Sequence, residues 1–172
     1  MLDAKGLNKV ILLFIFDKME VAMKEDIIIE MAVSNEWLTY IDAKESFSEL
    51  ASSDFLTNVS PRGSIAHYSI TSDGRECLQH FYTEIPSSMR DSITEHVKKN
   101  RLIYRRKQDY SSDYFKNSDG TYTVVLKIES VTVPLLELKL NVQNRNTAKW
   151  IFKHWSDKAL SIYELIHDNL VE

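Results

Sequence analysis

The residue types that most often perform chemistry are few in this chain of 172 residues, and they are scattered along it. The five histidines are His67, His80, His96, His154 and His167. Their separations match no metal-ligand spacing, so we interpret them as surface or half-buried residues. The sequence contains no phosphate-binding glycine loop, no Gly-x-Ser-x-Gly motif and no His-Glu-x-x-His motif. We therefore expect no catalytic residue, no metal site and no cofactor, and we do not expect an enzyme.

The one cysteine, Cys77, excludes an internal disulfide and a thiolate-rich metal site. It follows Glu76 near the predicted start of a helix, and we interpret it as a small packing residue. A redox-sensing thiol is the alternative interpretation, because the N-terminus of a helix lowers the pKa of a cysteine.

Charge is distributed unevenly between the two halves of the sequence. Residues 1–84 contain 7 Lys and Arg against 14 Asp and Glu, whereas residues 85–172 contain 14 against 11. The segment KKNRLIYRRK, residues 98–107, is strongly basic and is interrupted by apolar side chains. Contact with phosphate groups or with an acidic partner is one interpretation of this segment. We prefer a solvated helix face, because the segment lies beyond the predicted N-terminal domain.

A strand joins a helix without a linker in the segment AHYSITSDGREC, residues 66–77. Alternating side chains predict the strand, and Thr71 is typical of the N-cap of the helix that follows. Asp73 falls in the first helical turn, and Gly74 allows close packing at the join. We infer that a small folded unit ends at this point and that the next helix leaves from it.

Three helices are predicted before that strand. Residues 6–18 carry apolar side chains almost all round the first helix, which favours burial on several sides. A short strand is predicted at residues 20–23, a second helix at residues 25–34, and a turn directly after it.

The third helix is predicted to start near Thr39 and to run to about Ser53. Thr39-x-x-Asp42 is similar to a capping box, in which side chains satisfy the free backbone N–H groups of the first turn. Asp54 is expected to end the helix, since aspartate tolerates the left-handed conformation better than most residues. Two strands, residues 55–59 and 65–70, then form a hairpin.

The tip of that hairpin is the segment SPRGS, residues 60–64. Pro61 suits the second position of a tight turn, and Gly63 follows two places later. Arg62 makes the tip basic.

Two short motifs accompany this order of elements. One is Leu50-x-x-x-Asp54-Phe55-Leu56, and the more specific one is Tyr68-x-Ile70-Thr71-x-x-Gly74. They are similar to the Leu-x-x-x-Gly-Leu-Ile/Val and Tyr-x-Leu-Thr-x-x-Gly motifs of winged helix-turn-helix domains in the PadR and MarR groups of bacterial regulators. This resemblance covers residues 5–83. The whole chain also resembles an uncharacterised bacterial family with this N-terminal module and a small α+β C-terminal part.

The second half of the chain is predicted to contain a different order of helices and strands. A long helix is predicted from Pro86 to about Lys107, then strands near residues 109–117, 121–130 and 135–143, and finally a helix over residues 147–170. The strands carry apolar side chains on one face, which the last helix can cover. We therefore predict an α+β protein with a winged helix-turn-helix domain at residues 1–84 and a dimerisation or ligand-sensing domain at residues 85–172.

The resemblance implies that the third helix and the hairpin contact DNA. With Phe47, Leu50 and Ala51 facing inward, the outer face of the helix is expected to carry acids, which oppose the phosphate field. These acids are Asp42, Glu45 and Glu49. The residues predicted to contact DNA are Thr39, Tyr40, Lys44, Arg62, Ser64 and His67.

Two functions remain open at this point. One is a DNA-binding transcriptional regulator, a homodimer on double-stranded DNA that pairs through its C-terminal half, where Trp150 and Trp155 offer aromatic contacts. The alternative is a protein-interaction module whose acidic third helix binds a basic partner. The sequence names no small-molecule effector. The apolar run at residues 10–16 is too short to span a bilayer, so we expect a cytoplasmic protein without a membrane segment.

Overall fold

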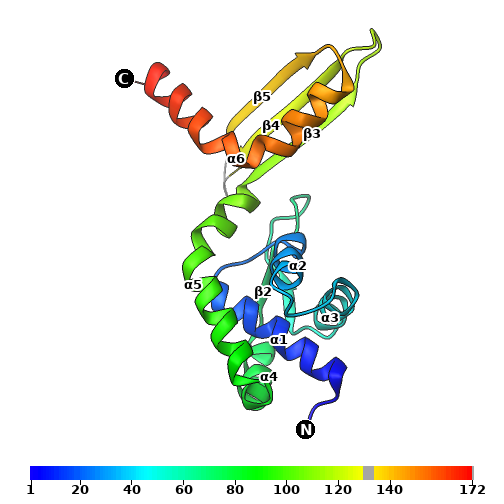
Figure 1. Cartoon of the computed structure of the whole chain (residues 1–172), viewed down its shortest axis with the longest axis vertical. Coiled ribbons are helices and arrows are strands. Elements are labelled where there is room, and N and C mark those ends of the chain that lie inside the picture. The colour runs from blue at the N-terminus through cyan, green and yellow to red at the C-terminus, as the bar shows by residue number, and fades with distance from the viewer. Residues whose placement is uncertain (130–133, 172) are drawn as a thin grey trace. The chain divides into compact units, whose positions relative to one another are not determined.

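The computed structural model describes residues 1–129 and 134–171, and its fold is α+β (Figure 1). The chain divides into two compact units, Met1–Arg105 and Arg106–Glu172. The first unit contains the helices α1 (Ala4–Met19), α2 (Glu25–Ser34), α3 (Tyr40–Ser52) and α4 (Ser72–Phe81), the 3-10 helix η1 (Tyr82–Glu84), the strands β1 (Leu56–Asn58) and β2 (Tyr68–Ile70), and most of α5 (Ser87–Asp109). The second unit contains the strands β3 (Tyr110–Lys116), β4 (Tyr122–Glu129) and β5 (Pro134–Val142) and the helix α6 (Arg145–Leu170).

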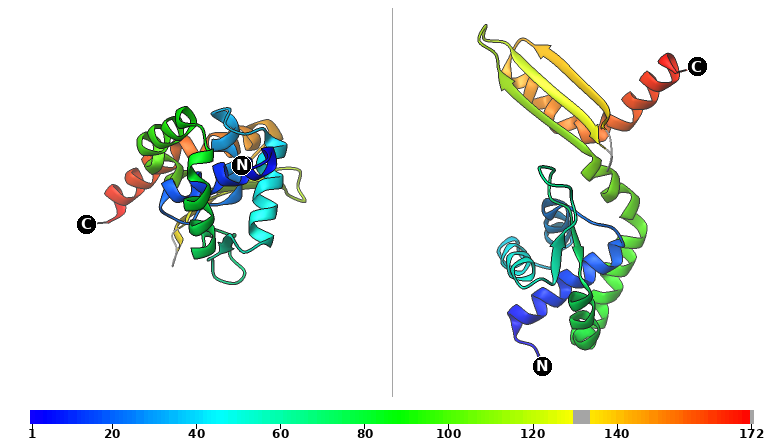
Figure 2. Two further views of the ribbon diagram at one scale, coloured as in Figure 1. Left: turned by 90° about the horizontal axis from the view of Figure 1, so that it is seen from below. Right: turned by 180° about the vertical axis from the view of Figure 1, so that it is seen from behind.

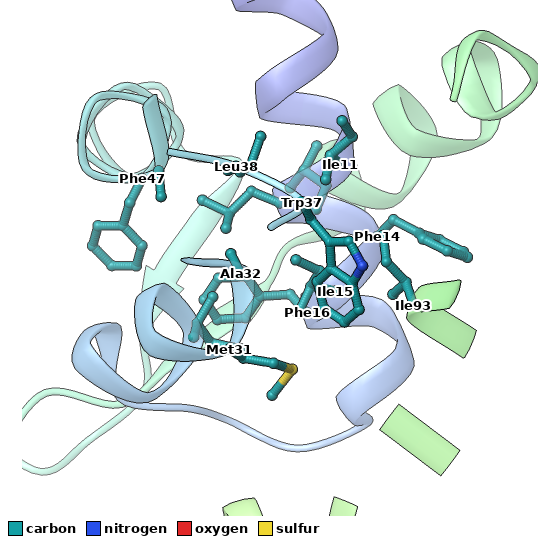
Figure 3. Packing of buried hydrophobic residues seen from close by; sticks show 14 of the residues in the cluster. Ile11, Phe14, Ile15, Phe16, Met31, Ala32, Trp37, Leu38, Phe47 and Ile93 are labelled. Atoms are coloured by element: carbon teal, nitrogen blue, oxygen red, sulfur yellow. The ribbon is translucent and has the colours of Figure 1, made fainter. Parts of the chain in front are cut away.

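The core of the first unit is built around α1. Every side chain of residues 10–16 is buried, which confirms the prediction of a helix covered on several sides. Figure 3 shows Phe14, Ile15 and Phe16 among apolar side chains from α2, α3 and α5. A helix that is apolar all round can only be stable in such an environment.

The tight join between β2 and α4 has a clear structural cause. The Thr71 hydroxyl accepts a hydrogen bond from the backbone N–H of Gly74 at 3.0 Å and donates one to the carbonyl of Asp54 at 2.7 Å. A Cβ atom at Gly74 would lie 2.4 Å from the carbonyl oxygen of Phe55, so only glycine fits without a shift. Thr71 and Gly74 thus fasten the start of α4 to the segment that follows α3, as their positions in the sequence predict.

The predicted strand at residues 20–23 is reduced to a single bridge. Glu20 adopts the left-handed conformation, with φ of 61°, and ends α1. Only Met23 then pairs with Tyr68, through backbone hydrogen bonds of 2.9 and 2.8 Å, because α2 already begins at Glu25.

The hairpin strands are also shorter than predicted. β1 and β2 pair antiparallel over three residues each, from Leu56 opposite Ile70 to Asn58 opposite Tyr68. Beyond them the Ser60 hydroxyl accepts from the backbone N–H of His67 at 2.8 Å. This side-chain bond occupies a donor that a longer strand would have used.

The division between the compact units lies within α5, whereas the sequence analysis placed the domain boundary after residue 84. Ile93 and Val97 of α5 are fully buried in the core of the first unit. Most of this helix is therefore part of the first unit.

The second unit is a three-stranded antiparallel sheet, in the order β3-β4-β5, covered by α6 (Figure 1). Val124, Leu126 and Ile128 of β4 are buried against α6, as the alternation of that strand predicts. The predicted strand 121–130 ends at Glu129, and its last residue lies outside the described part of the chain.

Candidate functional site

The connection from α2 to α3 is held by backbone hydrogen bonds. The backbone N–H groups of Trp37 and Leu38 both donate to the carbonyl of Ala32, at 3.0 and 3.2 Å. Glu36 occupies the left-handed region with φ of 59°, which reverses the chain direction. The indole of Trp37 is 7% exposed and donates to Ser92 at 3.0 Å, which anchors the turn on α5.

Thr39 caps the start of α3 as predicted, but the Asp42 carboxylate bonds to the Thr39 hydroxyl rather than to a backbone N–H group. The Thr39 hydroxyl accepts from the backbone N–H of Asp42 at 3.2 Å and donates to the Asp42 carboxylate at 2.7 Å. Both bonds stabilise the first turn of the helix, and they occupy the hydroxyl of Thr39. Asp54 has the expected left-handed conformation just beyond the end of the helix, with φ of 60°.

The rotation of α3 is confirmed by its buried face. Phe47 and Leu50 are 4% and 1% exposed, and the Phe47 ring lies edge-on to Tyr68 with ring centroids 4.8 Å apart. Ile41, on the opposite side of the helix, is 67% exposed, and Tyr40, in the first turn, is 60% exposed. The sequence analysis did not single out Ile41, although its position opposite the buried face already indicates exposure.

Of the three acids expected on the outer face of α3, Glu45 and Glu49 are exposed as predicted, and Asp42 is not. Asp42 is half-buried and engaged by Thr39, so it does not belong to the open outer face. The carboxylate of Glu45 lies 3.7 Å from the ammonium group of Lys5.

Glu49 is held even more closely by a lysine of α1. Its carboxylate accepts a hydrogen bond of 2.9 Å from Lys9, and this bond, with the positive charge of Lys9, lowers the pKa of Glu49. Two lysines of α1 therefore offset the negative charge of two acids of α3. These pairs could not be predicted from the sequence, because about forty residues separate each lysine from its partner.

Lys44 is also paired. Its ammonium group donates to the carboxylate of Glu25 at the start of α2, and this hydrogen bond raises the pKa of Lys44. The pair lies on the wall of a groove of about 400 Å³ between α2 and α3. The groove is lined by Glu25, Asp26, Ile29, Glu30, Val33, Ser34, Tyr40 and Lys44. It has an apolar floor and a predominantly acidic rim.

The hairpin tip presents the second group of predicted residues. Arg62 and Ser64 are exposed, and Gly63 between them has φ of 85°. Arg62 forms no hydrogen bond or ion pair with any residue in the described part of the chain, so its guanidinium is available to a ligand. His67 is half-buried, and its Nδ1 lies 3.0 Å from the Ser60 hydroxyl and 2.9 Å from the carbonyl of Ile65.

The predicted site residues thus form two groups in the first unit. Thr39, Tyr40 and Lys44 lie together at the start of α3, and Tyr40 and Lys44 share the groove. Arg62 and Ser64 lie at the hairpin tip. Three of the six predicted residues are engaged within the first unit: Thr39 through its hydroxyl, Lys44 through its ammonium group and His67 through Nδ1.

The described residues form no metal site and no activated thiol. Within residues 1–129 and 134–171, no three His, Cys, Asp or Glu side chains lie close enough together to hold a metal ion. Burial raises the pKa of the Cys77 thiol, which is opposite to the activation that a redox-sensing cysteine needs.

The geometry defines an α+β protein with two compact units and a helix–turn–helix–hairpin surface in the first. The chain belongs to the family described as "Domain of unknown function (DUF4364)", whose model matches residues 8–170. No curated protein and no solved structure matches the chain. Among the helices in the described ranges, none combines the length and apolar character that crossing a membrane requires.

Proposed function

We propose that the protein is a winged-helix DNA-binding transcriptional regulator that acts in the cytoplasm as a homodimer. The order α1, bridge at Met23, α2, α3, β1, β2 supports this proposal, in which α3 is the recognition helix and the hairpin is the wing. A recognition helix contacts the base edges through its N-terminal residues, and Tyr40 and Ile41 are the exposed residues there.

The observation that carries the proposal is the pairing of the α3 acids with α1. Phosphate attraction supplies most of the affinity for DNA, and unpaired carboxylates on a recognition helix would oppose it. Because Lys5 and Lys9 lie beside Glu45 and Glu49, the repulsion from these acids is reduced. Arg62 at the wing tip is then free to meet a phosphate or enter the minor groove.

A single module of this kind is expected to bind weakly. Ion pairs between exposed groups are partly screened by salt, and the rim of the α2–α3 groove remains acidic. Two linked modules on one duplex raise the effective affinity without any new contact, which favours a homodimer.

The first experiment is a fluorescence-anisotropy titration of mixed genomic DNA fragments at several salt concentrations. We expect Arg62→Ala to weaken binding and to lower the salt slope by about one unit, because one phosphate contact is lost. Arg145→Ala removes an exposed arginine from the second unit and is the matched control. The reasoning fails if both substitutions change the slope equally.

The second experiment neutralises an acid of α3. Glu45→Gln removes a negative charge and frees Lys5, so non-specific DNA binding should strengthen at low salt. If neither wild type nor Glu45→Gln binds DNA, the DNA-binding proposal is wrong.

A second candidate function is a winged-helix interaction module for a basic protein partner. The acidic, apolar-floored groove between α2 and α3 favours it, since a basic amphipathic segment would complement both features. Glu45 does not line this groove, so Glu45→Gln should leave binding of a basic partner there unchanged, whereas Glu30→Gln, on the groove rim, should weaken it. Together the two variants discriminate between the two functions, because Glu45→Gln should strengthen DNA binding.

A further inference from the structure

The apolar face of α6 is longer than the sheet it covers. Ala148, Trp155 and Ala159 on this face are 0–3% exposed. The same face continues through Ile166, which is half-exposed, to Leu170, which is 78% exposed. The 26 residues of α6 span about 39 Å, whereas the 8 residues of β4 span about 27 Å. Both views in which α6 is seen from the side show its last turns running past the sheet (Figures 1 and 2).

Part of the sheet is uncovered on the same side. Strand register places Leu140 opposite Val124 and Leu138 opposite Leu126, so these leucines face the side that α6 packs against. Val124 is completely buried, but Leu140 is 43% exposed. The contacts of α6 are mainly with β3 and β4, which leaves the apolar side of β5 only partly covered.

The hydrophobic core of the second unit is small for a unit of this size. Its fully buried apolar residues, within the described part, are Val124, Leu126, Ile128, Ala148, Trp155 and Ala159. A unit of fewer than about 70–80 residues seldom gains enough stability from a single core, and association is one common remedy. Trp155 cannot serve as an intermolecular contact, because it is 3% exposed and its indole donates to the carbonyl of Lys127 at 3.0 Å.

We propose that a second copy of this chain docks on this surface, with the C-terminal halves of two α6 helices packed antiparallel about a two-fold axis. This inference deepens the homodimer part of the proposed function and rests on it. If the two α6 helices pack antiparallel, their sheets lie at opposite ends of the helix pair. A parallel arrangement would bring the two sheets into the same space. The antiparallel arrangement also directs the end of each α6 toward the uncovered side of the partner's β5, so one contact accounts for both exposed surfaces.

The available area is sufficient for a stable pair. The apolar residues of the surface, exposed or half-exposed in one copy, are Leu136, Leu138, Leu140, Val142, Ile162, Leu165, Ile166 and Leu170. Leu140, Leu165 and Leu170 are 43–78% exposed and the other five are half-buried, so together they offer on the order of 500 Å² of apolar surface. Stable interfaces bury roughly 800 Å² per partner, of which about 60% is apolar. The surface has no excess beyond this, so loss of its two most exposed leucines, Leu165 and Leu170, should abolish the pair.

The main experiment measures molar mass by light scattering after gel filtration at tens of micromolar. We expect the wild type at twice the 20.0 kDa of one chain, and the double variant Leu165→Glu, Leu170→Glu at 20.0 kDa. Leu160→Glu makes the same change about 120° around α6 from Ile166 and should remain dimeric. Far-UV circular dichroism checks that each variant is folded. A folded double variant that is still dimeric overturns the proposal.

Cross-linking tests the geometry without disturbing the surface charge. In a Cys77→Ser background, Ile166→Cys lies near its own copy across the proposed two-fold axis, and a short bismaleimide should link the two chains. Leu160→Cys should not be linked. If the double glutamate variant fails to fold, this comparison decides, and a dimer linked equally through both cysteines refutes the proposed pairing.

Failure of this proposal is distinguishable from failure of the DNA-binding function. A monomeric wild type whose DNA binding still depends on Arg62 would remove the α6 pairing and leave DNA binding standing. A dimer broken by the leucine substitutions, but without any DNA affinity, would leave the pairing standing and remove the DNA-binding function.

Discussion

Replacement of Phe47 by alanine tests the rotation of α3, on which the description of the candidate surface depends. Phe47 is 4% exposed, and its ring lies edge-on to Tyr68 and tilted against Phe16. The ring centroids are 4.8 Å apart in the first pair and 6.3 Å apart in the second. Truncation of a buried phenylalanine costs about 3–5 kcal/mol of folding free energy, of which each aromatic pair contributes about 0.5–1.5 kcal/mol. Since small domains are stable by about 5–15 kcal/mol, the first unit should stay folded but become marginal.

Hydrogen exchange followed by mass spectrometry measures this loss unit by unit. Under conditions where exchange reports the opening equilibrium, amides of residues 10–16 in α1 should exchange about two to three and a half powers of ten faster. Amides of β4, in the second unit, should be unchanged. Ile41→Ala is the matched control on the same helix, since Ile41 is 67% exposed and its loss should cost no more than about 0.5 kcal/mol. Less than a tenfold effect of Phe47→Ala, or an equal effect of Ile41→Ala, would refute the assigned rotation.

Two further predictions concern the first unit. Gly74→Ala should lower the melting temperature, because the new methyl group would lie 2.4 Å from the Phe55 carbonyl oxygen and 2.8 Å from Ile70. Overpacking costs about 1–3 kcal/mol, which exceeds the gain of at most about 1 kcal/mol in helix propensity. An equal or higher melting temperature would contradict this prediction. Stability should also fall between pH 7.5 and 5.5 through His96. Burial, aided by the charge of Lys99, lowers the pKa of His96 in the folded protein. On acidification His96 is therefore protonated first in the unfolded chain, near the ordinary histidine pKa of 6.5, and stability begins to fall there. The fall in stability ends once the pH is below the lowered pKa of the folded protein. Urea denaturation at both pH values should show a smaller fall for His96→Gln than for wild type, and equal falls would exclude this contribution.

The rotation of α3 could be predicted from residues a few positions apart. Spacing of three and four residues between Phe47, Leu50 and Ala51 determines which face of a helix is apolar, whatever that face packs against. The cap at Thr39 and the join at Thr71 and Gly74 are equally local, because each depends on bonds or contacts close to one helix start. These features were therefore accessible from the sequence.

The electrostatic character of the candidate surface was not accessible in the same way. The helical periodicity of the sequence predicts that Glu45 and Glu49 face outward. It contains no information on which lysines lie beside them. That Lys5 and Lys9 do so depends on how α1 crosses α3 in the folded unit. The pairing of Lys44 with Glu25, nineteen residues away, depends in the same way on the packing of α2 against α3.

The sequence by itself determined where the helices and the longer strands form and which side of each is apolar, because the periods of 3.6 and 2 residues are properties of the local backbone. It also determined the alternation that makes one side of β4 buried and the apolar stripe along α6. Only the tertiary structure decided how far each apolar side is covered: it buries Trp155 under its own sheet and leaves Leu170 of the same helix exposed. Coverage depends on the relative lengths and positions of packed elements, which are set by contacts between residues far apart in the chain.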